Sequence, residues 1–387
     1  MSTELRVAMI GHGFMGAAHS VGWRQAPAVF ELPLRPRMAV LVGRDADKTA
    51  ASARQWGWDE TSTDWRAVIE RSDIDVVDIV TPGDSHAEIA IAALAAGKHV
   101  LCEKPLANSV DEAEAMRQAA QDAAAHGIRA MVGFTYRRVP AVTLMRDMIA
   151  DGRIGTVRQV RASYRQDWLA DPGSPMTWRL DKERAGSGAL GDIGAHIVDM
   201  AQFVTGQSLT QVSAALETIV EERPLLGESV GLSGTAGDER GRVTVDDLAL
   251  FIGRLESGTL ASFEATRFAT GRKNALDIEV SGDAGALHWN LEDLNALDFY
   301  DATRPPLEQG FTRILVTEPE HPYLEGWWPA GHMLGYEHGF SHQAKDLIEA
   351  IVHGREPRPT FADGLHVQRV LDAVERSASN SAVWTEV

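Results

Sequence analysis

A glycine-rich segment near the start of the chain lies between a short apolar run and a stretch of helical periodicity. The apolar run covers residues 5–10, the segment at 11–16 reads GHGFMG, and the helical pattern covers residues 17–23. In this spacing the first glycine permits a tight turn, the second lets backbone amides approach a pyrophosphate, and the third allows close helix-to-strand packing. The N–H groups of the helix start then face the phosphates. The segment predicts dinucleotide binding, and the alternative is a glycine-rich turn without a ligand.

Short β-branched runs alternate with alanine-rich stretches of helical period as far as residue 138. This alternation is typical of βαβ units, whose helices cover both faces of a parallel sheet. Ser109 and Glu112 have the spacing of a capping box, which indicates a helix start. We therefore expect an α/β fold in which residues 1–138 form a Rossmann doubly wound parallel sheet that binds a dinucleotide. The expected strands are residues 5–10, 37–42, 76–81, 99–101 and 129–134.

Beyond Pro140, strands dominate the pattern, and turn residues such as Ser257 and Gly258 separate them. Consecutive strands joined by short turns favour an antiparallel meander. We expect residues 139–387 to form an α+β domain with an open, largely antiparallel sheet. The expected strands are residues 157–168, 209–220, 243–255, 259–266, 277–281 and 286–289, and the main expected helices are residues 192–204, 337–352 and 364–377.

Charge and cysteine content exclude several classes of partner and site. The 387 residues include 37 basic and 55 acidic side chains, so the formal net charge is −18. A surface this negative repels nucleic acid and anionic membranes, and neither is an expected partner. Cys102 is the only cysteine, which rules out an internal disulfide and a thiolate metal cluster. Because no secretory signal or membrane-spanning run of roughly 18 apolar residues is recognisable, we expect a cytoplasmic protein.

The end of the second expected strand bears on the choice between NAD and NADP. An acidic residue there binds the ribose 2′-hydroxyl of NAD, whereas an arginine accommodates the 2′-phosphate of NADP. This chain has Gly43 at the expected acidic position, followed by Arg44 and Asp45. Arg44 is either a cofactor ligand or an exposed loop charge, so both cofactors stay open.

The third and fourth expected strands end in polar segments, at the sheet edge where doubly wound folds bind ligands. Thr81 ends the third strand and Pro82 and His86 follow it, whereas Glu103 and Lys104 follow the fourth. The Lys104 ammonium can donate to a substrate oxygen, although an ordinary surface role is the alternative. His86 can equally be a helix-start residue. The residues expected to bind the cofactor are Gly11, Gly13, Phe14, Met15, Gly16, Arg44, Thr81, Pro82, His86, Glu103 and Lys104.

Four separated segments resemble the glucose-fructose oxidoreductase and inositol dehydrogenase (Gfo/Idh/MocA) superfamily of NAD(P)-dependent enzymes. They are GHGFMG at 11–16, EKP at 103–105, AGSGALGDIGAH at 185–196 and the segment 358–370. The resemblance spans nearly the whole chain and is greatest to the group of levoglucosan dehydrogenase and inositol dehydrogenase-like enzymes. It implies oxidation of a secondary hydroxyl of a sugar, anhydrosugar or cyclitol to a ketone, with hydride transfer to nicotinamide. It also implies a homodimer or homotetramer formed through the C-terminal sheet.

The same resemblance implies that Lys104, Asp192 and His196 form the catalytic group. The spacing agrees with this role, because residues four apart on a helix share one face and can point into one cleft. A histidine can accept the proton of a hydroxyl while a lysine stabilises the developing alkoxide and a carboxylate orients the donors. The alternative for His196 is a buried structural histidine.

Tryptophans outside the periodic core runs are candidates for holding a sugar-like ring. An indole face stacks on the C–H face of a pyranose or cyclitol, while polar neighbours bind its hydroxyls. Alternatively, these tryptophans fill a domain junction or an oligomer contact. The residues expected to bind substrate are Tyr136, Asp167, Trp168, Trp178, Arg179, Asp192 and His196.

Two other functions stay open at this point. One is a glycosidase that retains its NAD and uses transient oxidation to assist bond cleavage, and the other is a dinucleotide or sugar sensor without chemistry. His338, His342 and Asp346 follow one another at four-residue intervals and could offer metal ligands on one helix face. The resemblance requires no metal there, and we expect none.

Overall fold

The computed structural model describes residues 4–230 and 233–387, which form two compact units. The first unit is Met1–Thr135 with Glu337–Gln368, and the second is Tyr136–Tyr336 with Arg369–Val387. This division differs from the expected contiguous ranges 1–138 and 139–387, because the chain returns to the first unit near its C-terminus. The reason is packing: the apolar face of helix α9 (His338–Val352) contributes Ala344, Leu347 and Ile348 to the core of the first unit.

The first unit is built on a parallel sheet of six strands in the order β3-β2-β1-β4-β5-β6. This order is that of a Rossmann fold, and it confirms the expected doubly wound sheet. The strand β3 was not expected, because its three residues form an edge strand with little burial. The strands are β1 (Glu4–Ile10), β2 (Arg35–Val42), β3 (Glu60–Ser62), β4 (Val76–Ile79), β5 (His99–Cys102) and β6 (Ala130–Val132).

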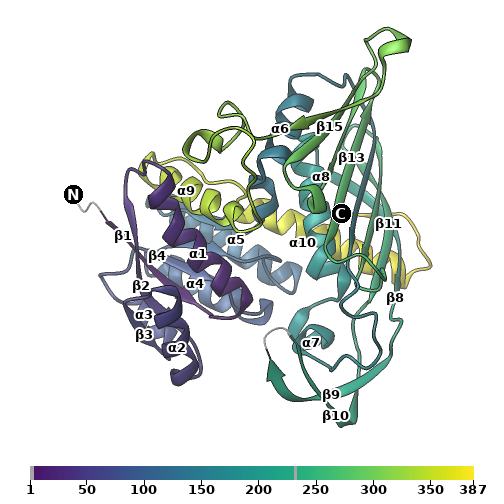
Figure 1. Ribbon diagram of the computed structural model, residues 1–387. Coiled ribbons are helices and arrows are strands. Elements are labelled where there is room, and N and C mark those ends of the chain that lie inside the picture. Colours follow the sequence, from purple (N-terminus) through teal and green to yellow (C-terminus); the bar gives the residue numbers. More distant parts are fainter. Residues whose placement is uncertain (1–3, 231–232) are drawn as a thin grey trace. The chain divides into compact units, whose positions relative to one another are not determined.

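Helices alternate with these strands along the chain (Figure 1). Several of them begin at side-chain caps. Asp45 accepts from Lys48 N at the start of α2, and the expected capping box of Ser109 and Glu112 starts α5. The helices are α1 (Phe14–Val29), α2 (Ala46–Trp56), α3 (Trp65–Ile69), α4 (His86–Ala95), α5 (Val110–Ala124) and α9. The helix α10 (Phe361–Ser379) begins in this unit and ends in the second.

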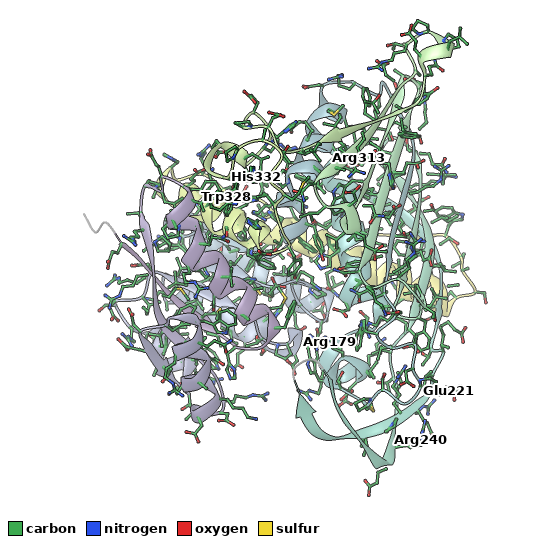
Figure 2. The ribbon with its side chains drawn as sticks, in the orientation of Figure 1. Arg179, Glu221, Arg240, Arg313, Trp328 and His332 are labelled. Atoms are coloured by element: carbon green, nitrogen blue, oxygen red, sulfur yellow. The ribbon has the colours of Figure 1, made fainter. Side chains whose placement is uncertain are left out.

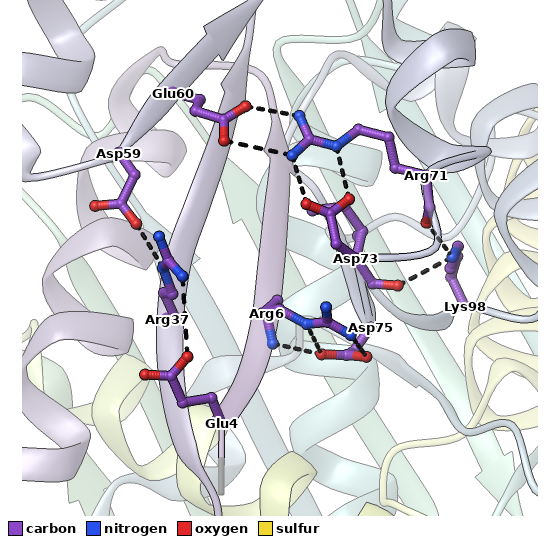
Figure 3. Close-up of polar contacts among 10 residues, drawn as sticks. Glu4, Arg6, Arg37, Asp59, Glu60, Arg71, Asp73, Asp75 and Lys98 are labelled. Carbon is purple, nitrogen blue, oxygen red and sulfur yellow. Dashed lines mark hydrogen bonds and ion pairs between the residues drawn. The ribbon is translucent and has the colours of Figure 1, made fainter. Parts of the chain in front are cut away.

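Ion pairs occupy the amino-terminal edge of the parallel sheet (Figure 3). Arg6 in β1 pairs with Asp75 at 2.9 Å, and Arg37 in β2 pairs with Asp59 at 2.7 Å. Arg71 adds a pair with Glu60 at 2.7 Å. Because water screens such exposed pairs, they satisfy charges at this edge rather than drive folding.

The second unit contains a mixed sheet of nine strands in the order β16-β15-β14-β13-β7-β12-β11-β8-β17. All neighbours pair antiparallel except β7 and β12, which are parallel. The expectation of one continuous meander was therefore wrong, because β7 separates β12 from β13. The strands are β7 (Val157–Arg165), β8 (Leu209–Glu217), β11 (Leu248–Leu255), β12 (Leu260–Thr266), β13 (Ala275–Gly282), β14 (Gly285–Asn290), β15 (Ala296–Asp301), β16 (Phe311–Leu315) and β17 (Thr385–Glu386).

Helices α6 (Pro140–Ala150) and α8 (Ala195–Thr205) contact this sheet (Figure 1). Side chains alternate along β11, so Ala249 and Phe251 are buried whereas Leu250 and Ile252 are 45% and 42% exposed. The short α7 (Lys182–Ala185) and a two-stranded ribbon of β9 (Glu222–Val230) and β10 (Ser233–Arg242) complete the unit. No helix among the described residues is long and apolar enough to cross a membrane.

Candidate functional site

The three glycines of the 11–16 segment meet different surroundings. Gly11 has φ +110°, and a Cβ built on it would lie 2.8 Å from the carbonyl oxygen of Val80. A Cβ on Gly16 would lie 2.9 Å from the carbonyl oxygen of Gly11. Around Gly13 the space is open to 4 Å. Gly11 and Gly16 therefore make the turn and the close packing possible, and Gly13 leaves room beside the backbone.

This open backbone fits the pyrophosphate of a dinucleotide. Gly13 caps the 16-residue helix α1 without a side-chain hydrogen bond, and the first turn of the helix holds no acidic residue. The N–H groups of that turn and the positive end of the helix dipole favour a bound anion. Phe14 is 51% exposed, whereas Met15 packs against the core. Met15 can thus contribute its backbone to a cofactor site, while its side chain serves the fold.

At the end of β2, the surroundings of Gly43 leave no room for a side chain. A Cβ there would overlap Thr49 and lie 2.7 Å from Nε2 of His12. Asp45 is engaged as the cap of α2, and its hydrogen bond from Lys48 N lowers its pKa. Arg44 is exposed. Asp45 is also exposed but caps α2, so Arg44 is the exposed side chain at this edge that does not cap the helix.

The loops after β4 and β5 are tied together by His86. Its ring is 1% exposed, with Nδ1 at 3.0 Å from the carbonyl oxygen of Pro105 and Nε2 at 2.9 Å from that of Thr81. Pro82 starts the short helix Gly83–Ser85 between these contacts. His86 therefore shapes the loops that carry Thr81 and Lys104, and its ring nitrogens are already used by the protein.

Beneath Lys104, the side chain of Glu103 belongs to a buried charged cluster. Glu103 Oε1 lies 3.0 Å from Nε2 of His19, and Nδ1 of His19 lies 2.9 Å from Oδ2 of Asp78. Trp23 donates to the same Asp78 oxygen at 2.7 Å. Since the Glu103 carboxylate is 4% exposed and held by His19, it can fix the loop that carries Lys104.

In the second unit, the glycine-rich segment 185–196 ends in a π-helical turn, Leu190–Gly194, that continues into α8. Asp246 holds its start: Oδ1 accepts from Gly188 N at 2.7 Å and Oδ2 from Leu190 N at 2.8 Å. A Cβ on Gly188 would overlap the backbone carbonyl of Asp246, so only glycine fits there. The prediction of a single helix over 192–204 was wrong at its start, because residues 190–194 form a π-helical turn and α8 begins at Ala195. Asp192 lies in the π turn and His196 in the first turn of α8, and such turns recur at functional sites.

Asp192 pairs with a residue that the sequence did not single out. Nη2 of Arg267, directly after β12, lies 3.1 Å from Oδ2 of Asp192 and donates to the carbonyl oxygen of Gly188 at 2.8 Å. The guanidinium is 1% exposed and lies 5.4 Å from the ring centroid of Trp168. No local signal marks Arg267, because it lies 75 residues after Asp192 in the sequence.

His196 lies among aromatic rings. Its ring centroid is 4.7 Å from that of Tyr136 and 6.0 Å from that of Tyr164. Burial raises the pKa of both tyrosines, so both hydroxyls keep their protons at neutral pH. The ring of Tyr336 lies 6.4 Å from that of Tyr136.

A chain of hydrogen bonds fixes the direction in which these hydroxyls donate. Trp168 Nε1 donates to Gln166 Oε1 at 3.0 Å, so the amide nitrogen of Gln166 faces Asn274 and donates to its Oδ1 at 2.7 Å. Tyr164 donates to the same Asn274 oxygen at 2.7 Å. Its only proton is then used, and Tyr136 must donate to Tyr164 across 2.8 Å. The hydroxyl oxygen of Tyr136 is left as a hydrogen-bond acceptor.

The other expected substrate residues have mixed surroundings. The Asp167 carboxylate accepts from Lys273 at 2.7 Å and from Gly271 N at 3.1 Å, and these bonds lower its pKa. The Arg179 guanidinium, labelled in Figure 2, lies 4.5 Å from the ring centroid of Trp178. Burial lowers the pKa of Arg179. Asp167 is thus occupied by partners within the protein, whereas Arg179 is a cation near Asp192.

The second unit therefore brings together Asp192, His196, Tyr136, Trp168 and Arg179, and the first unit holds the glycine turn and Lys104. Sequence reasoning missed the residues that support them. These are Arg267, Asp246, Tyr164, Gln166 and Asn274 in the second unit and His19 and Asp78 in the first. Within residues 4–230 and 233–387, no group of three His, Cys, Asp or Glu side chains could hold a metal ion.

Comparisons with known proteins match both parts of the chain. A family model described as an oxidoreductase family with an NAD-binding Rossmann fold matches residues 5–134, and a GFO/IDH/MocA C-terminal domain matches residues 142–288. The chain is 42% identical to levoglucosan dehydrogenase of Pseudarthrobacter phenanthrenivorans, over 99% of this chain and 98% of that protein.

Solved structures are similar over the whole length. An oxidoreductase domain protein from Kribbella flavida has a TM-score of 0.95 and 61% identity, with 100% of both chains covered. Levoglucosan dehydrogenase in complex with NADH and levoglucosan has a TM-score of 0.93 and 41% identity, with 99% of each chain covered.

Proposed function

Since the chain belongs to the Gfo/Idh/MocA family of oxidoreductases with an NAD-binding Rossmann fold, we propose that it oxidises a secondary hydroxyl of a sugar-like ring to a ketone. The proposed substrate is an anhydrosugar of the levoglucosan type, with sugars and cyclitols as the wider class. The levoglucosan dehydrogenase to which the chain is 42% identical supports this choice.

The observation that carries the proposal is the arrangement around His196. Asp192 lies four residues before it, in a turn held by Asp246 and Arg267, and the acceptor oxygen of Tyr136 belongs to the ring packed on it. A histidine with a purely structural role would not need an ion-paired carboxylate one turn away. It would also not need an adjacent hydroxyl whose oxygen is fixed as a hydrogen-bond acceptor. The arrangement suits the recognition and deprotonation of an alcohol.

Each residue has a proposed role in the reaction. Oxidation removes a proton from the alcohol oxygen and a hydride from the carbon, and the nicotinamide of NAD supplies the hydride acceptor when it is bound. A ring nitrogen of His196 takes the proton, and Asp192 orients the hydrogen bonds around it. The ammonium of Lys104 donates to the same oxygen and stabilises its developing negative charge.

The residues around His196 also indicate how the sugar-like ring of the substrate is bound. The oxygen of Tyr136 accepts from a second hydroxyl, which favours a polyol over a simple alcohol. Trp168 is 39% exposed and offers an indole face to the apolar side of a ring. Arg179 and Trp178 are proposed to bind further oxygens and ring C–H groups, and the paired Asp167 shapes the loop.

NAD is the proposed cofactor. The turn of Gly11, Gly13 and Gly16 holds the pyrophosphate, with the backbone of Phe14 and Met15 at the helix start. Gly43 provides no carboxylate for the ribose 2′-hydroxyl, so Arg44 and the edge of His12 are the groups proposed to meet that ribose. The loops with Thr81, Pro82, His86 and Glu103 are proposed to border the nicotinamide half.

A homo-oligomer in the cytoplasm completes the proposal. On β11 and β12, Leu250, Ile252 and Leu260 are 45%, 42% and 45% exposed, an apolar strip that suits a symmetric sheet-to-sheet contact. Light scattering on the purified protein measures the mass, and a monomer at micromolar concentration contradicts this part.

The test of the proposed reaction is the formation of reduced cofactor, followed by absorbance. Purified protein is mixed with NAD or NADP and with levoglucosan, myo-inositol, scyllo-inositol, glucose or xylose in turn. A clear rate with levoglucosan and NAD is the expected result. Silence on all substrates, with NADH binding still measurable, overturns the dehydrogenase and favours a glycosidase that retains its cofactor or a sensor.

A further inference from the structure

Arg267 is a buried cation whose contacts converge on the segment that carries Asp192. Its guanidinium is 1% exposed, and Nη2 lies 3.1 Å from Asp192 Oδ2 and 2.8 Å from the carbonyl oxygen of Gly188. That carbonyl also accepts from the backbone N–H of Asp192 at 3.0 Å. One nitrogen of Arg267 therefore contacts both the side chain of Asp192 and the backbone group that bonds to Asp192.

The cost of burying this guanidinium indicates a purpose beyond stability. Removing a cation from water is expensive, and its attraction to one carboxylate offsets that cost only in good geometry. Nε of Arg267 is buried and has no hydrogen-bond partner among the described residues. Nη1 lies 3.5 Å from the carbonyl oxygen of Arg179, so the fold keeps a buried, only partly satisfied guanidinium where it faces Asp192.

The surroundings of Asp192 balance its charge from several elements. Arg267 after β12 and Arg179 in the short helix Trp178–Leu180 present positive charge to it. Tyr136 and Tyr164 also lie near Asp192: burial is the main cause that raises the pKa of both hydroxyls, and the charge of Asp192 adds to it. His196 lies one turn further along the chain. The two guanidinium groups favour the ionised form of the Asp192 carboxylate.

We propose that Arg267 is a positioning residue for the reaction, which keeps Asp192 deprotonated and aimed as a hydrogen-bond acceptor beside His196. This inference rests on the proposed dehydrogenase function and extends it. An acceptor at this place selects the orientation of His196 and of the substrate hydroxyls that donate to it. A protonated Asp192 presents a donor instead, and a rotated Asp192 directs its acceptor oxygens away from the site, so either change lowers the rate of proton removal.

The second unit offers a matched control in Arg223 of β9. Its side chain is 0% exposed, and its Nε also lacks a hydrogen-bond partner among the described residues. It donates to the carbonyl oxygens of Leu169 at 2.7 Å and Asp171 at 2.9 Å, and not to Asp192. Arg223→Gln therefore removes an equally buried guanidinium without touching the carboxylate.

The experiment compares wild type, Arg267→Gln, Arg267→Lys and Arg223→Gln on the best substrate from the panel. We expect Arg267→Gln to lower kcat by about tenfold or more, with a smaller change in KM, because the lost cation favours protonation of Asp192. For the same reason the acidic limb of the kcat/KM profile moves to higher pH. Arg267→Lys restores the position of that limb. Arg223→Gln leaves it in place.

A double-mutant cycle with Asp192→Asn separates positioning from a general structural role. If Arg267 acts through Asp192, the variant with both changes is no slower than Asp192→Asn alone. Losses that multiply, or an acidic limb that stays in place in Arg267→Gln, overturn the inference.

The cycle also has a readout that does not depend on the reaction. Denaturant titration measures the free energies of unfolding of wild type, Arg267→Gln, Asp192→Asn and the double variant. Together they give the coupling energy between Arg267 and Asp192. If the wild type oxidises no substrate, the proposed function has failed. The coupling energy still tests whether Arg267 and Asp192 form an ion pair. A coupling energy near zero overturns that interaction independently of the reaction.

Discussion

Nδ1 of His19 lies 2.9 Å from Oδ2 of Asp78 in the fully buried interior of the first unit. The other ring nitrogen faces Glu103, the residue before Lys104, at 3.0 Å. Burial lowers the pKa of His19, but the charges and hydrogen bonds of the two carboxylates outweigh it and raise the pKa to about 10. An imidazole that is charged at neutral pH therefore links helix α1 to the loop that carries Lys104.

This link predicts an alkaline loss of stability. The folded pKa of His19, about 10, is above its unfolded value of 6.5, so the stabilisation is complete below pH 6.5 and is lost as the pH rises through 10. Denaturant titrations from pH 7 to 10 should show a falling free energy of unfolding in wild type and a flatter curve in His19→Gln. At pH 7 the variant is expected to lose about 3 kcal/mol or more.

His99 is the control for this prediction. Burial lowers its pKa from 6.5 to about 4, so between pH 7 and 10 it is neutral in the folded state and mostly neutral in the unfolded state. His99→Gln should therefore keep the alkaline slope of wild type. An equal slope in wild type and His19→Gln contradicts the charged state of His19.

The proposed catalytic roles predict a loss of turnover without loss of cofactor. Lys104→Ala or His196→Ala should lower kcat by about 10² or more, because each removes a group that stabilises or takes up charge in the transition state. NADH affinity, measured by fluorescence titration, should stay near that of wild type. Turnover close to wild type in either variant removes that residue from the mechanism.

The glycine turn predicts a separation of binding from folding. Gly13→Ala adds a Cβ where the protein leaves open space, so thermal unfolding should shift by no more than about 2 °C while NADH binding weakens about tenfold. Gly11→Ala imposes φ +110° on alanine and overlaps the Val80 carbonyl, which should cost about 2 kcal/mol or more. Unchanged NADH affinity in Gly13→Ala argues against a pyrophosphate at this backbone.

The π turn predicts that one glycine of its segment is irreplaceable and another is not. Gly188→Ala overlaps the backbone of Asp246 and should cost about 2 kcal/mol or more together with activity. Gly194→Ala places its Cβ 3.4 Å from that of Ala265, at φ −63°, and should be tolerated. Calorimetry of both variants checks the difference, and similar midpoints refute it.

The hydrogen-bond chain predicts that Asn274 matters through its oxygen. Asn274→Leu leaves Tyr164 and Gln166 without their acceptor, frees the direction of the Tyr136 hydroxyl and should lower kcat/KM by about tenfold. Asn274→Asp keeps an acceptor for both donors and should retain more activity. The prediction fails if the aspartate variant is as slow as the leucine variant.

Features decided by neighbours in the chain were predictable. The spacing of Gly11, Gly13 and Gly16 after an apolar run determines a strand–turn–helix unit, and Ser109 with Glu112 determines a capped helix start. The doubly wound sheet and the family resemblance followed from such signals, and the family match confirms both the resemblance and the oxidoreductase class. The four-residue interval of Asp192 and His196 was also readable.

Tertiary structure decided what depends on distant partners. The edge strands β3 and β17 have weak sequence patterns, because only their pairing with β2 and β8 defines them. The strand β7 pairs with β12, which lies about a hundred residues further along the chain. The segment Glu337–Gln368 belongs to the first unit because the apolar face of its helix α9 packs on α1. Arg267 beside Asp192 and Asn274 beside Tyr164 have no local signal, since a buried charge or amide acquires its meaning from the group that the fold places opposite it.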